Sequence, residues 1–239
     1  MALTFDFPRG NANAYTAPTG ITPLSISAAD LEVDYQWFRD DTAPFTDYSG
    51  NSRSGELRLG GPSIEPTPNY IREGGAFTAV VVILTGSTTA NDLSVVSGQT
   101  AANGIQFRVD ATAAPGITNL KAFYRHSEGT NRTVTFGNPG IGPSRYAALA
   151  LTWDGVNSTS GQVKAFLNGA QFGSTHTLDG ALTTLPDGTS GFNRLLFLQN
   201  SFAGDWAWLS FYSRALTDAQ ILADYQARQN RLRIAGVAI

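Results

Sequence analysis

The stretch that decides the fold reads Leu149-Ala-Leu-Thr-Trp-Asp-Gly155, followed after a polar loop by Gly161-Gln-Val-Lys-Ala-Phe-Leu-Asn-Gly169. Apolar side chains occupy every second position of 149–153 and again of 163–167, which is the period of a strand with one buried face. Asp-Gly and Asn-Gly turn the chain sharply, and Asn-Gly favours hairpins. This stretch therefore predicts a strand, a loop, a second strand and a tight turn.

A second stretch, Gly204 to Tyr225, predicts how the domain ends. It begins with a strand through Tyr212 and continues through a short connector to Thr217. Thr217 and Gln220 have the spacing of a capping box, in which each side chain satisfies a free backbone N–H of the other residue. Ile221, Leu222 and Tyr225 would then lie on one helical face. The pattern predicts a short amphipathic helix that packs back on the sheet.

Together and in this order, the two stretches resemble laminin-G-like jelly-roll domains of the concanavalin A-like lectin/glucanase superfamily. The resemblance is carried by Trp153-Asp-Gly155, Leu167-Asn-Gly169 and the connector Arg214-Ala-Leu216. Asp47-Tyr-Ser-Gly-Asn51 is similar to a loop that precedes the family's early strands. The resemblance spans roughly residues 30–228. It implies an all-β fold, a two-sheet antiparallel jelly-roll sandwich with a short C-terminal helix.

The rest of the chain fits one sandwich. We divide it into an N-terminal strand and arm (1–29), the jelly-roll sandwich (30–228) and a C-terminal tail (229–239). The tail is basic and then apolar, and it forms either an extra edge strand or an anchor to a partner. The segment 40–69 is rich in loop residues. Apolar runs predict further strands at 3–7, 31–38, 77–84, 93–96, 104–109, 120–124, 133–136, 194–199 and 206–212.

Composition excludes several classes of protein. The 239 residues have a net charge of −3 and only 15% charged side chains, against about 25% in ordinary domains. Nucleic-acid binding needs a clustered basic face, so this balance argues against it. No apolar run approaches the roughly 20 residues of a membrane span. The chain has no cysteine, and its first residues lack the basic and apolar regions of a signal peptide.

These features lead us to expect a virion protein. A neutral, polar sandwich is typical of extracellular modules, yet this chain shows neither an export signal nor a cysteine. A phage component that is made in the host cytoplasm and exposed only after lysis would reconcile the two. We expect protein partners within the particle, a possible cell-surface glycan, and homo-oligomerisation.

Catalysis is not expected. Glucanases that share the resembling fold carry two glutamates on one strand, one as nucleophile and one as acid/base. The glutamates here stand at positions 32, 56, 65, 73 and 128, so no two fall within five residues of each other. His126 and His176 lie in polar, turn-like segments and are expected at the surface. We therefore predict that the protein is not an enzyme.

Aromatic residues provide the candidate binding site. Simple alternation puts Trp206, Trp208 and Tyr212 on one side of their strand, and Arg194 could lie nearby. The resembling family usually has an Ile-Asp-Glu-like triplet at 206–208, so this chain replaces two acids with aromatic rings. Two interpretations stay open: the rings are part of the core or a subunit interface, or they form a ligand platform.

A calcium site is the one cofactor that the sequence raises. Asp47 and Asn51 supply oxygen ligands of the kind that Ca²⁺ prefers. Asp and Asn are also common turn residues, and the turn is the favoured interpretation. No other cofactor is expected.

Three hypotheses follow. The first is a non-enzymatic structural, decoration or adhesion protein of a phage head or tail. The second is a soluble carbohydrate-binding module of the lectin type. The third, which the glutamate spacing disfavours, is a glycan hydrolase or lyase.

Overall fold

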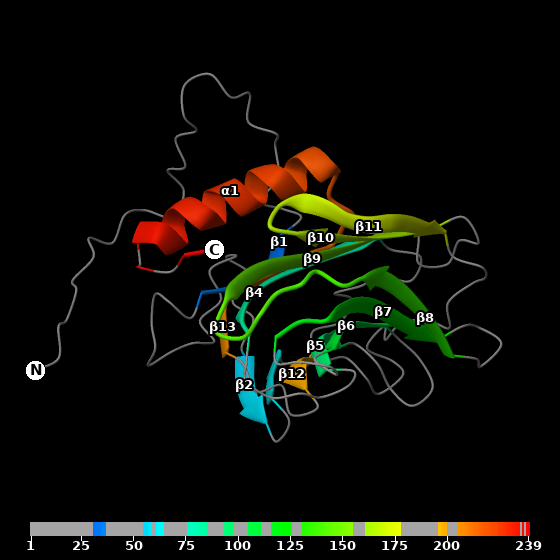
Figure 1. The fold of residues 1–239 in the computed structure, drawn as a ribbon, viewed down its shortest axis with the longest axis horizontal. Helices are drawn as coiled ribbons and strands as arrows, with labels where there is room; N and C mark the ends of the chain where they lie inside the picture. The colour runs from blue at the N-terminus through cyan, green and yellow to red at the C-terminus, as the bar shows by residue number, and fades with distance from the viewer. Residues whose placement is uncertain are drawn as a thin grey trace, which may run out of the picture.

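The computed structural model describes residues 31–36, 55–58, 61–64, 76–85, 93–97, 105–110, 116–125, 131–154, 161–177, 196–199, 205–234, 236, 238 and 239. Within these residues the chain forms two antiparallel sheets and one helix, α1 (Asp218–Ile234) (Figure 1). The predicted two-sheet antiparallel sandwich with a C-terminal helix is confirmed. The predicted strand at 3–7 lies outside the described residues.

One sheet has six strands in the order β1-β13-β4-β9-β10-β11, and the other has seven in the order β2-β3-β12-β5-β6-β7-β8. The six strands are β1 (Leu31–Gln36), β13 (Asp205–Tyr212), β4 (Phe77–Leu84), β9 (Tyr146–Asp154), β10 (Gln162–Leu167) and β11 (Ala170–Thr177). The seven are β2 (Gly55–Arg58), β3 (Gly61–Ile64), β12 (Leu196–Gln199), β5 (Leu93–Ser97), β6 (Ile105–Asp110), β7 (Asn119–Arg125) and β8 (Asn131–Gly137).

The hairpin predicted from the opening stretch is confirmed and extended. β9 and β10 pair antiparallel, with Leu151 opposite Ala165. Asn168 and Gly169 then turn the chain with φ angles of 50° and 82°, as two-residue hairpin turns require. The turn leads into β11, a strand that the apolar pattern did not predict. A side chain at Gly169 would lie 2.8 Å from the Tyr225 ring, so α1 packs directly over this turn.

The main core lies on the face of the six-stranded sheet that is turned away from α1. Phe77 stacks on Trp153 with ring centroids 6.1 Å apart, and on Phe211 at 5.5 Å. All three side chains are buried. Their strands pair in register, β4 with both β9 and β13, so a continuous aromatic row crosses three strands. Leu120 and Ala122 on β7 are buried side chains of the opposite sheet.

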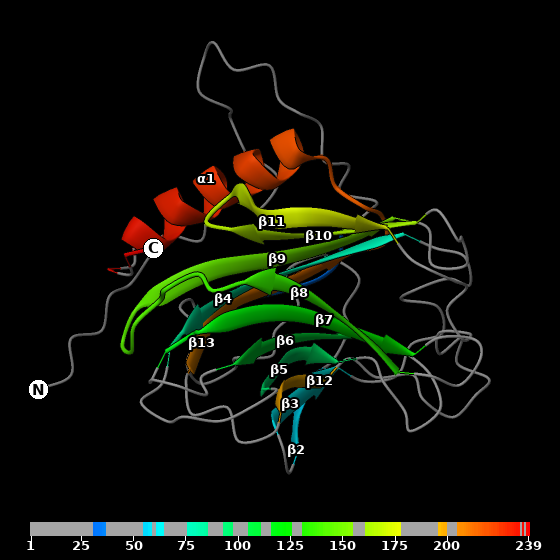
Figure 2. The same ribbon diagram turned by 45° about the vertical axis from the view of Figure 1, so that its right-hand side comes forward.

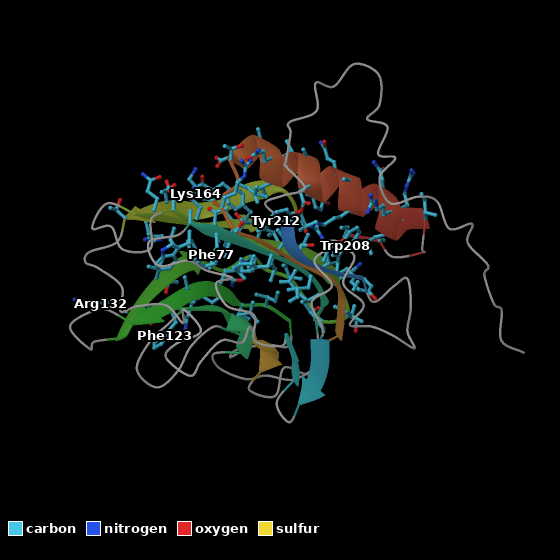
Figure 3. All side chains as sticks on the ribbon, turned by 180° about the vertical axis from the view of Figure 1, so that it is seen from behind. Phe77, Phe123, Arg132, Lys164, Trp208 and Tyr212 are labelled. Atoms are coloured by element: carbon cyan, nitrogen blue, oxygen red, sulfur yellow. The ribbon has the colours of Figure 1, made fainter. Side chains whose placement is uncertain are left out.

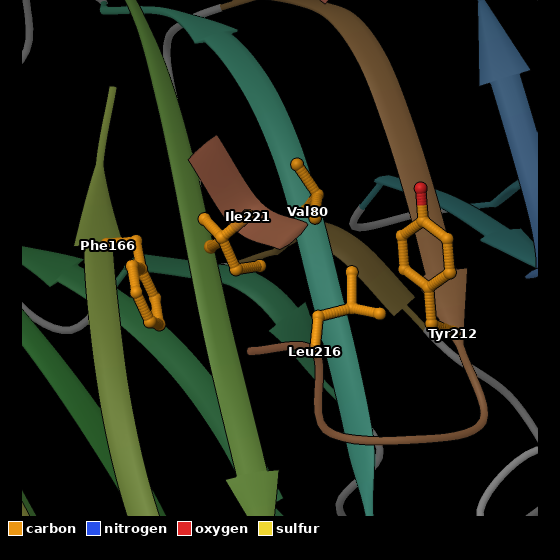
Figure 4. Packing of buried hydrophobic residues seen from close by; sticks show 6 residues of the cluster. Val80, Phe166, Tyr212, Leu216 and Ile221 are labelled. Atoms are coloured by element: carbon orange, nitrogen blue, oxygen red, sulfur yellow. The ribbon is translucent and has the colours of Figure 1, made fainter. Parts of the chain in front are cut away.

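A second apolar layer lies between the six-stranded sheet and α1. Figure 4 shows Val80 of β4, Phe166 of β10 and Tyr212 of β13 gathered beneath Ile221 of α1. Further along the helix, Leu232 packs on a second cluster that includes Val82 and Trp208; the other members are Ala148 and Ala207. β4 is therefore buried on both faces, which is why seven of its eight residues are apolar. The exception is Thr78, whose hydroxyl donates to the Arg214 carbonyl oxygen at 2.9 Å. Figure 2 shows α1 lying across this sheet.

The two sheets meet along one side. The edge strands β8 and β11 lie against each other (Figure 2). Gly173 makes this approach possible, because a Cβ atom there would lie 2.3 Å from the Phe136 carbonyl oxygen. His176 packs edge-on against the Phe136 ring at 5.3 Å and is only partly exposed. The surface position expected for His176 is thus partly correct, while His126 lies outside the described residues.

Helix α1 differs from the prediction in length and in its buried face. It continues to Ile234, so the first part of the tail at 229–239 is helical and is not an extra edge strand. Leu222 is 43% exposed, whereas Ile221 is buried, so the expected shared face of the two is wrong. The buried side of the helix instead includes Gln220 and Arg228. Among the described residues, no helix is both long enough and apolar enough to cross a bilayer.

The predicted capping box is confirmed at the start of α1. The Gln220 backbone N–H donates to Thr217 Oγ1 at 3.3 Å, and the Thr217 N–H donates to Gln220 Oε1 at 2.9 Å. Thr217→Ala removes one acceptor, and we expect a loss of about 1 kcal/mol of unfolding free energy, measured by urea unfolding. Thr217→Ser keeps the oxygen and is the matched control. Equal stability of Thr217→Ala and the unchanged protein would contradict a role for the box.

Candidate functional site

A group of buried and partly buried polar side chains, joined by hydrogen bonds, lies beneath α1. Asp34 of β1 stands opposite Ser210 of β13 in the sheet register. Trp208, Ser210 and Tyr212 take alternate positions on β13, so they share the face that α1 covers. Asp224 and Arg228 reach them from the helix. Figure 3 shows Trp208 and Tyr212 beneath α1. We call Asp34, Trp208, Ser210, Tyr212, Asp224 and Arg228 the helix clasp.

Asp34 is the acceptor on the strand side of the clasp. The Trp208 Nε1–H donates to Asp34 Oδ1 at 2.6 Å, and the Ser210 hydroxyl donates to the same oxygen. Asp34 is buried, so these bonds replace the water that its carboxylate has lost. They also join the edge strand β1 to β13 through side-chain hydrogen bonds.

Arg228 joins the helix to the strands. Its Nε and Nη2 donate to the two carboxylate oxygens of Asp224 at 2.6 and 2.9 Å, which is bidentate pairing. Nη2 also donates to the Tyr212 hydroxyl at 3.1 Å, and that hydroxyl donates to Asp224 at 2.8 Å. The guanidinium lies 4.5 Å from the Trp208 ring centroid, a cation–π contact. Nη1 lies 3.9 Å from Asp34 Oδ1.

The surroundings raise the pKa values of two clasp side chains, Tyr212 and Arg228. Burial raises the pKa of the Tyr212 hydroxyl well above its ordinary value of 10.0, and the Asp224 carboxylate raises it further. Burial alone would lower the pKa of the Arg228 guanidinium, but the combined effect of its neighbours, Asp224 first and then Tyr212 and Asp34, outweighs burial and raises this pKa. At neutral pH Tyr212 is therefore a neutral hydrogen-bond donor and Arg228 a cation. A tyrosine hydroxyl with a raised pKa is a weak acid that stays protonated at neutral pH, so the clasp is suited to holding α1 rather than to proton transfer.

Among the predicted site residues, the structure describes the side chains of Trp208 and Tyr212. Trp208 and Tyr212 are each 3% exposed, which makes them core side chains, the first of the two interpretations. A ligand could reach either ring only after α1 had left the sheet, and the platform interpretation stays a prediction. The side chain of Trp206 is not described, and Arg194, Asp47 and Asn51 lie outside the described residues. The calcium prediction is therefore untested.

Alternation on β13 is interrupted by a register shift between Trp206 and Trp208. Ala207 and Trp208 consequently contact the same cluster, although they are neighbours in sequence. A bulge of this kind changes the side of every residue before it. The expectation that Trp206 shares a side with Trp208 rested on unbroken alternation, and it no longer follows.

Sequence reasoning missed four members of the clasp: Asp34, Ser210, Asp224 and Arg228. Asp224 and Arg228 have the i, i+4 spacing of a helical ion pair, which was a usable local signal. Asp34 has no such signal, because its partners Trp208 and Ser210 lie 174 and 176 positions away in the sequence. No group of three or more His, Cys, Asp or Glu side chains that could hold a metal occurs within the described part of the chain.

A second candidate surface lies on the seven-stranded sheet, on the side of the molecule away from α1. Leu120 and Ala122 of β7 point into the core and are buried. Lys121 and Phe123 alternate with these two residues along β7, so they occupy the opposite face, together with their partners on β8. We call this the outer β7–β8 face, and its residues are Lys121, Phe123, Thr133 and Thr135. Thr133 and Thr135 are exposed, and Lys121 and Phe123 are partly exposed.

The chain matches one family model and many solved structures. Residues 60–222 match the Laminin_G_3 model, described as the concanavalin A-like lectin/glucanases superfamily. The binding domain of Paraclostridial Mosquitocidal Protein 1 has a TM-score of 0.62 at 12% identity, covering 85% of this chain and 53% of that one. The botulinum neurotoxin serotype G binding domain has a TM-score of 0.61 at 9% identity, covering 82% and 51%.

The receptor-binding domain of botulinum neurotoxin D has a TM-score of 0.60 at 12% identity, covering 85% of this chain and 54% of that one. This chain thus spans about half the length of the solved chains it matches. At these identities the likeness shows the fold: a lectin-like sandwich that also occurs in binding domains. No curated protein matches the sequence.

Proposed function

This chain belongs to the concanavalin A-like lectin/glucanase superfamily, and from that membership we propose that it is a non-enzymatic module that binds carbohydrate. The observation that carries the proposal is the likeness of its sandwich to solved binding domains. One of these was solved as the binding domain of botulinum neurotoxin DC in complex with SialylT. The chain spans only about half of that solved domain too, with 52% coverage, so ligand binding is carried over here as a proposal.

The two carboxylates of the helix clasp support a module that binds and does not catalyse. Asp34 accepts two hydrogen bonds, and Asp224 is paired bidentately with Arg228. A general acid or base must be able to reach a substrate proton. Asp34 is occupied in joining β1 to β13 and Asp224 in pairing with Arg228, so neither is available for that role.

The decisive experiment exposes the full chain to a broad glycan array and, in parallel, to a panel of polysaccharides. We expect saturable binding to a subset of glycans and no release of reducing sugar. Absence of binding to every glycan at high protein concentration would contradict carbohydrate recognition. Steady release of reducing ends would overturn the non-enzymatic assignment and favour a hydrolase.

We further propose that the protein is part of a phage virion, on the head or the tail, and that it forms homo-oligomers. Its support is the low charge, the lack of cysteine and the polar sandwich composition. The comparisons do not bear on it. Antibody labelling of purified particles would test it, since a decoration or adhesion protein must be found at regular positions on the particle surface.

A further inference from the structure

Charge is unevenly distributed over the two sheets. Strands β6, β7 and β8 contain four basic residues, Arg108, Lys121, Arg125 and Arg132, and one acidic residue, Asp110. These strands therefore contribute a formal +3, whereas the whole chain carries −3, which leaves −6 for all other residues. A positive region on an acidic protein attracts anionic ligands more strongly than the rest of the surface. Two of these three strands form the outer β7–β8 face, and the third, β6, pairs with β7 next to it.

The face itself has a regular geometry. In the register of the hairpin, Phe123 stands opposite Thr133 and Lys121 opposite Thr135. Directly opposite residues lie about 5 Å apart and alternate residues along a strand about 7 Å apart. The four side chains therefore form a small rectangle with one aromatic ring, one ammonium group and two hydroxyls. Arg132 is also exposed on β8, but it precedes Thr133 and so lies on the other face of the strand, beside the rectangle and not within it (Figure 3).

We propose that the outer β7–β8 face binds an acidic glycan, with the sugar ring against Phe123 and its carboxylate or sulfate group at Lys121. This inference rests on the proposed carbohydrate-binding function. An aromatic ring provides an apolar surface for the C–H face of a sugar. The Thr133 and Thr135 hydroxyls can both donate to and accept from sugar hydroxyls. The Lys121 ammonium supplies the charge that selects an acidic sugar over a neutral one.

A small ligand suits this face better than an acidic protein does. A stable protein interface buries about 800 Å² on each partner and involves some 20–30 residues a side. The rectangle has four residues, the scale of one or two sugar units. Strand addition at the β8 edge is also unfavourable, because β11 already lies against β8.

The chain offers a selective probe for this face, because it has only two lysines. Lys121 lies on the outer β7–β8 face, and Lys164 lies on the other sheet in an ion pair with Asp218 at 2.8 Å. Reductive methylation with ¹³C-formaldehyde preserves the charge and labels both. Loss of a signal in Lys121→Gln or Lys164→Gln assigns each lysine and separates both from the terminal amine.

The labelled protein is titrated with sialyllactose and with lactose, and in a second series with a heparin-derived oligosaccharide and its desulfated form. We expect the acidic member of a pair to shift the Lys121 signal and leave Lys164 unchanged. Lys121→Gln should weaken binding of the acidic glycan about tenfold, since it loses a charge-assisted contact. Lys164→Gln should bind as the unchanged protein does, and Phe123→Ala should weaken acidic and neutral glycans alike.

The outcomes separate the two proposals. If acidic glycans bind while the Lys121 signal stays in place and Lys121→Gln binds equally well, the site assignment is wrong and the carbohydrate-binding function stands. If neutral glycans bind as tightly as acidic ones, the charge selection is wrong. If poly-glutamate produces the same Lys121 shift at equal charge concentration, the face recognises polyanions and the assignment to a glycan fails. Lack of binding to any glycan contradicts both proposals.

Discussion

Arg228→Met is expected to lower the free energy of unfolding by roughly 3–5 kcal/mol, because it leaves buried groups that were paired with a cation without their partner. Arg228 is 3% exposed and donates to Asp224 and Tyr212. Methionine fills a similar volume, so the loss reports the charge and its hydrogen bonds more than packing. For a chain of this length the change corresponds to a fall of roughly 6–20 °C in Tm, measured by calorimetry or circular dichroism.

Arg231→Met is the matched control. Arg231 also lies over the Trp208 ring, at 5.8 Å, but it is exposed, so we expect a change within about 0.5 kcal/mol. The double variant Asp224→Leu/Arg228→Met should be more stable than the sum of the two single losses predicts, since neither charge is then left unpaired. A loss below about 1 kcal/mol in Arg228→Met would mean that the apolar contacts hold α1 without the clasp.

Phe77→Ala is expected to cost roughly 3–5 kcal/mol of unfolding free energy. The Phe77 ring is buried and stacks on both Trp153 and Phe211, so its removal leaves a cavity bordered by two large rings. Urea unfolding followed by tryptophan fluorescence measures the loss. The same variant should retain glycan binding under conditions where it is folded, because the ring faces the interior and not the outer β7–β8 face.

Phe77→Leu is the comparison that separates stacking from burial. Leucine keeps most of the apolar volume but has no ring, and stacked aromatic pairs contribute about 0.5–1.5 kcal/mol beyond the area they bury. We therefore expect a clearly smaller loss than for Phe77→Ala. Equal losses in the two variants would show that the aromatic row matters through its ring geometry and not through the volume it fills.

The elements that sequence alone predicted well are those with strong local patterns. The run 77–84 coincides with β4 because a strand covered by a sheet on one face and by α1 on the other is built mainly of apolar residues, here all except Thr78. The capping box at Thr217 and the Asn168-Gly169 turn were predictable because each depends on residues within a few positions of one another.

The elements that were missed have weak local patterns. β11 reads Ala-Gln-Phe-Gly-Ser-Thr-His-Thr, and most of its residues are exposed or partly exposed, so its apolar alternation is faint. β2 and β3 have four residues each and pair through a proline-containing segment, too short for a periodic signal. β11 pairs with β10 and β2 pairs with β3, the strands next to them in sequence, and β3 also pairs with the distant β12. Pairing, and not an apolar period, defines these strands.

The same difference between strong and weak local patterns explains why the site was predicted only in part. Trp208 and Tyr212 were identified as notable because aromatic residues are conspicuous on a strand. Whether they faced solvent depended on the length and the buried side of α1, and the helix buries polar residues that a hydrophobic pattern does not reveal. The outer β7–β8 face was not proposed from the sequence, because its four residues become neighbours only through the hairpin register.

The position of β13 between β1 and β4 has a consequence for synthesis. The ribosome completes β1 and β4 long before it reaches residues 205–212, yet both strands depend on that segment for a neighbour. Until then the nascent chain exposes strand edges whose unpaired backbone groups can recruit a second chain. The interval of greatest aggregation hazard is therefore set by the speed of translation between these segments, and chaperone protection matters most in that interval, however stable the finished protein is.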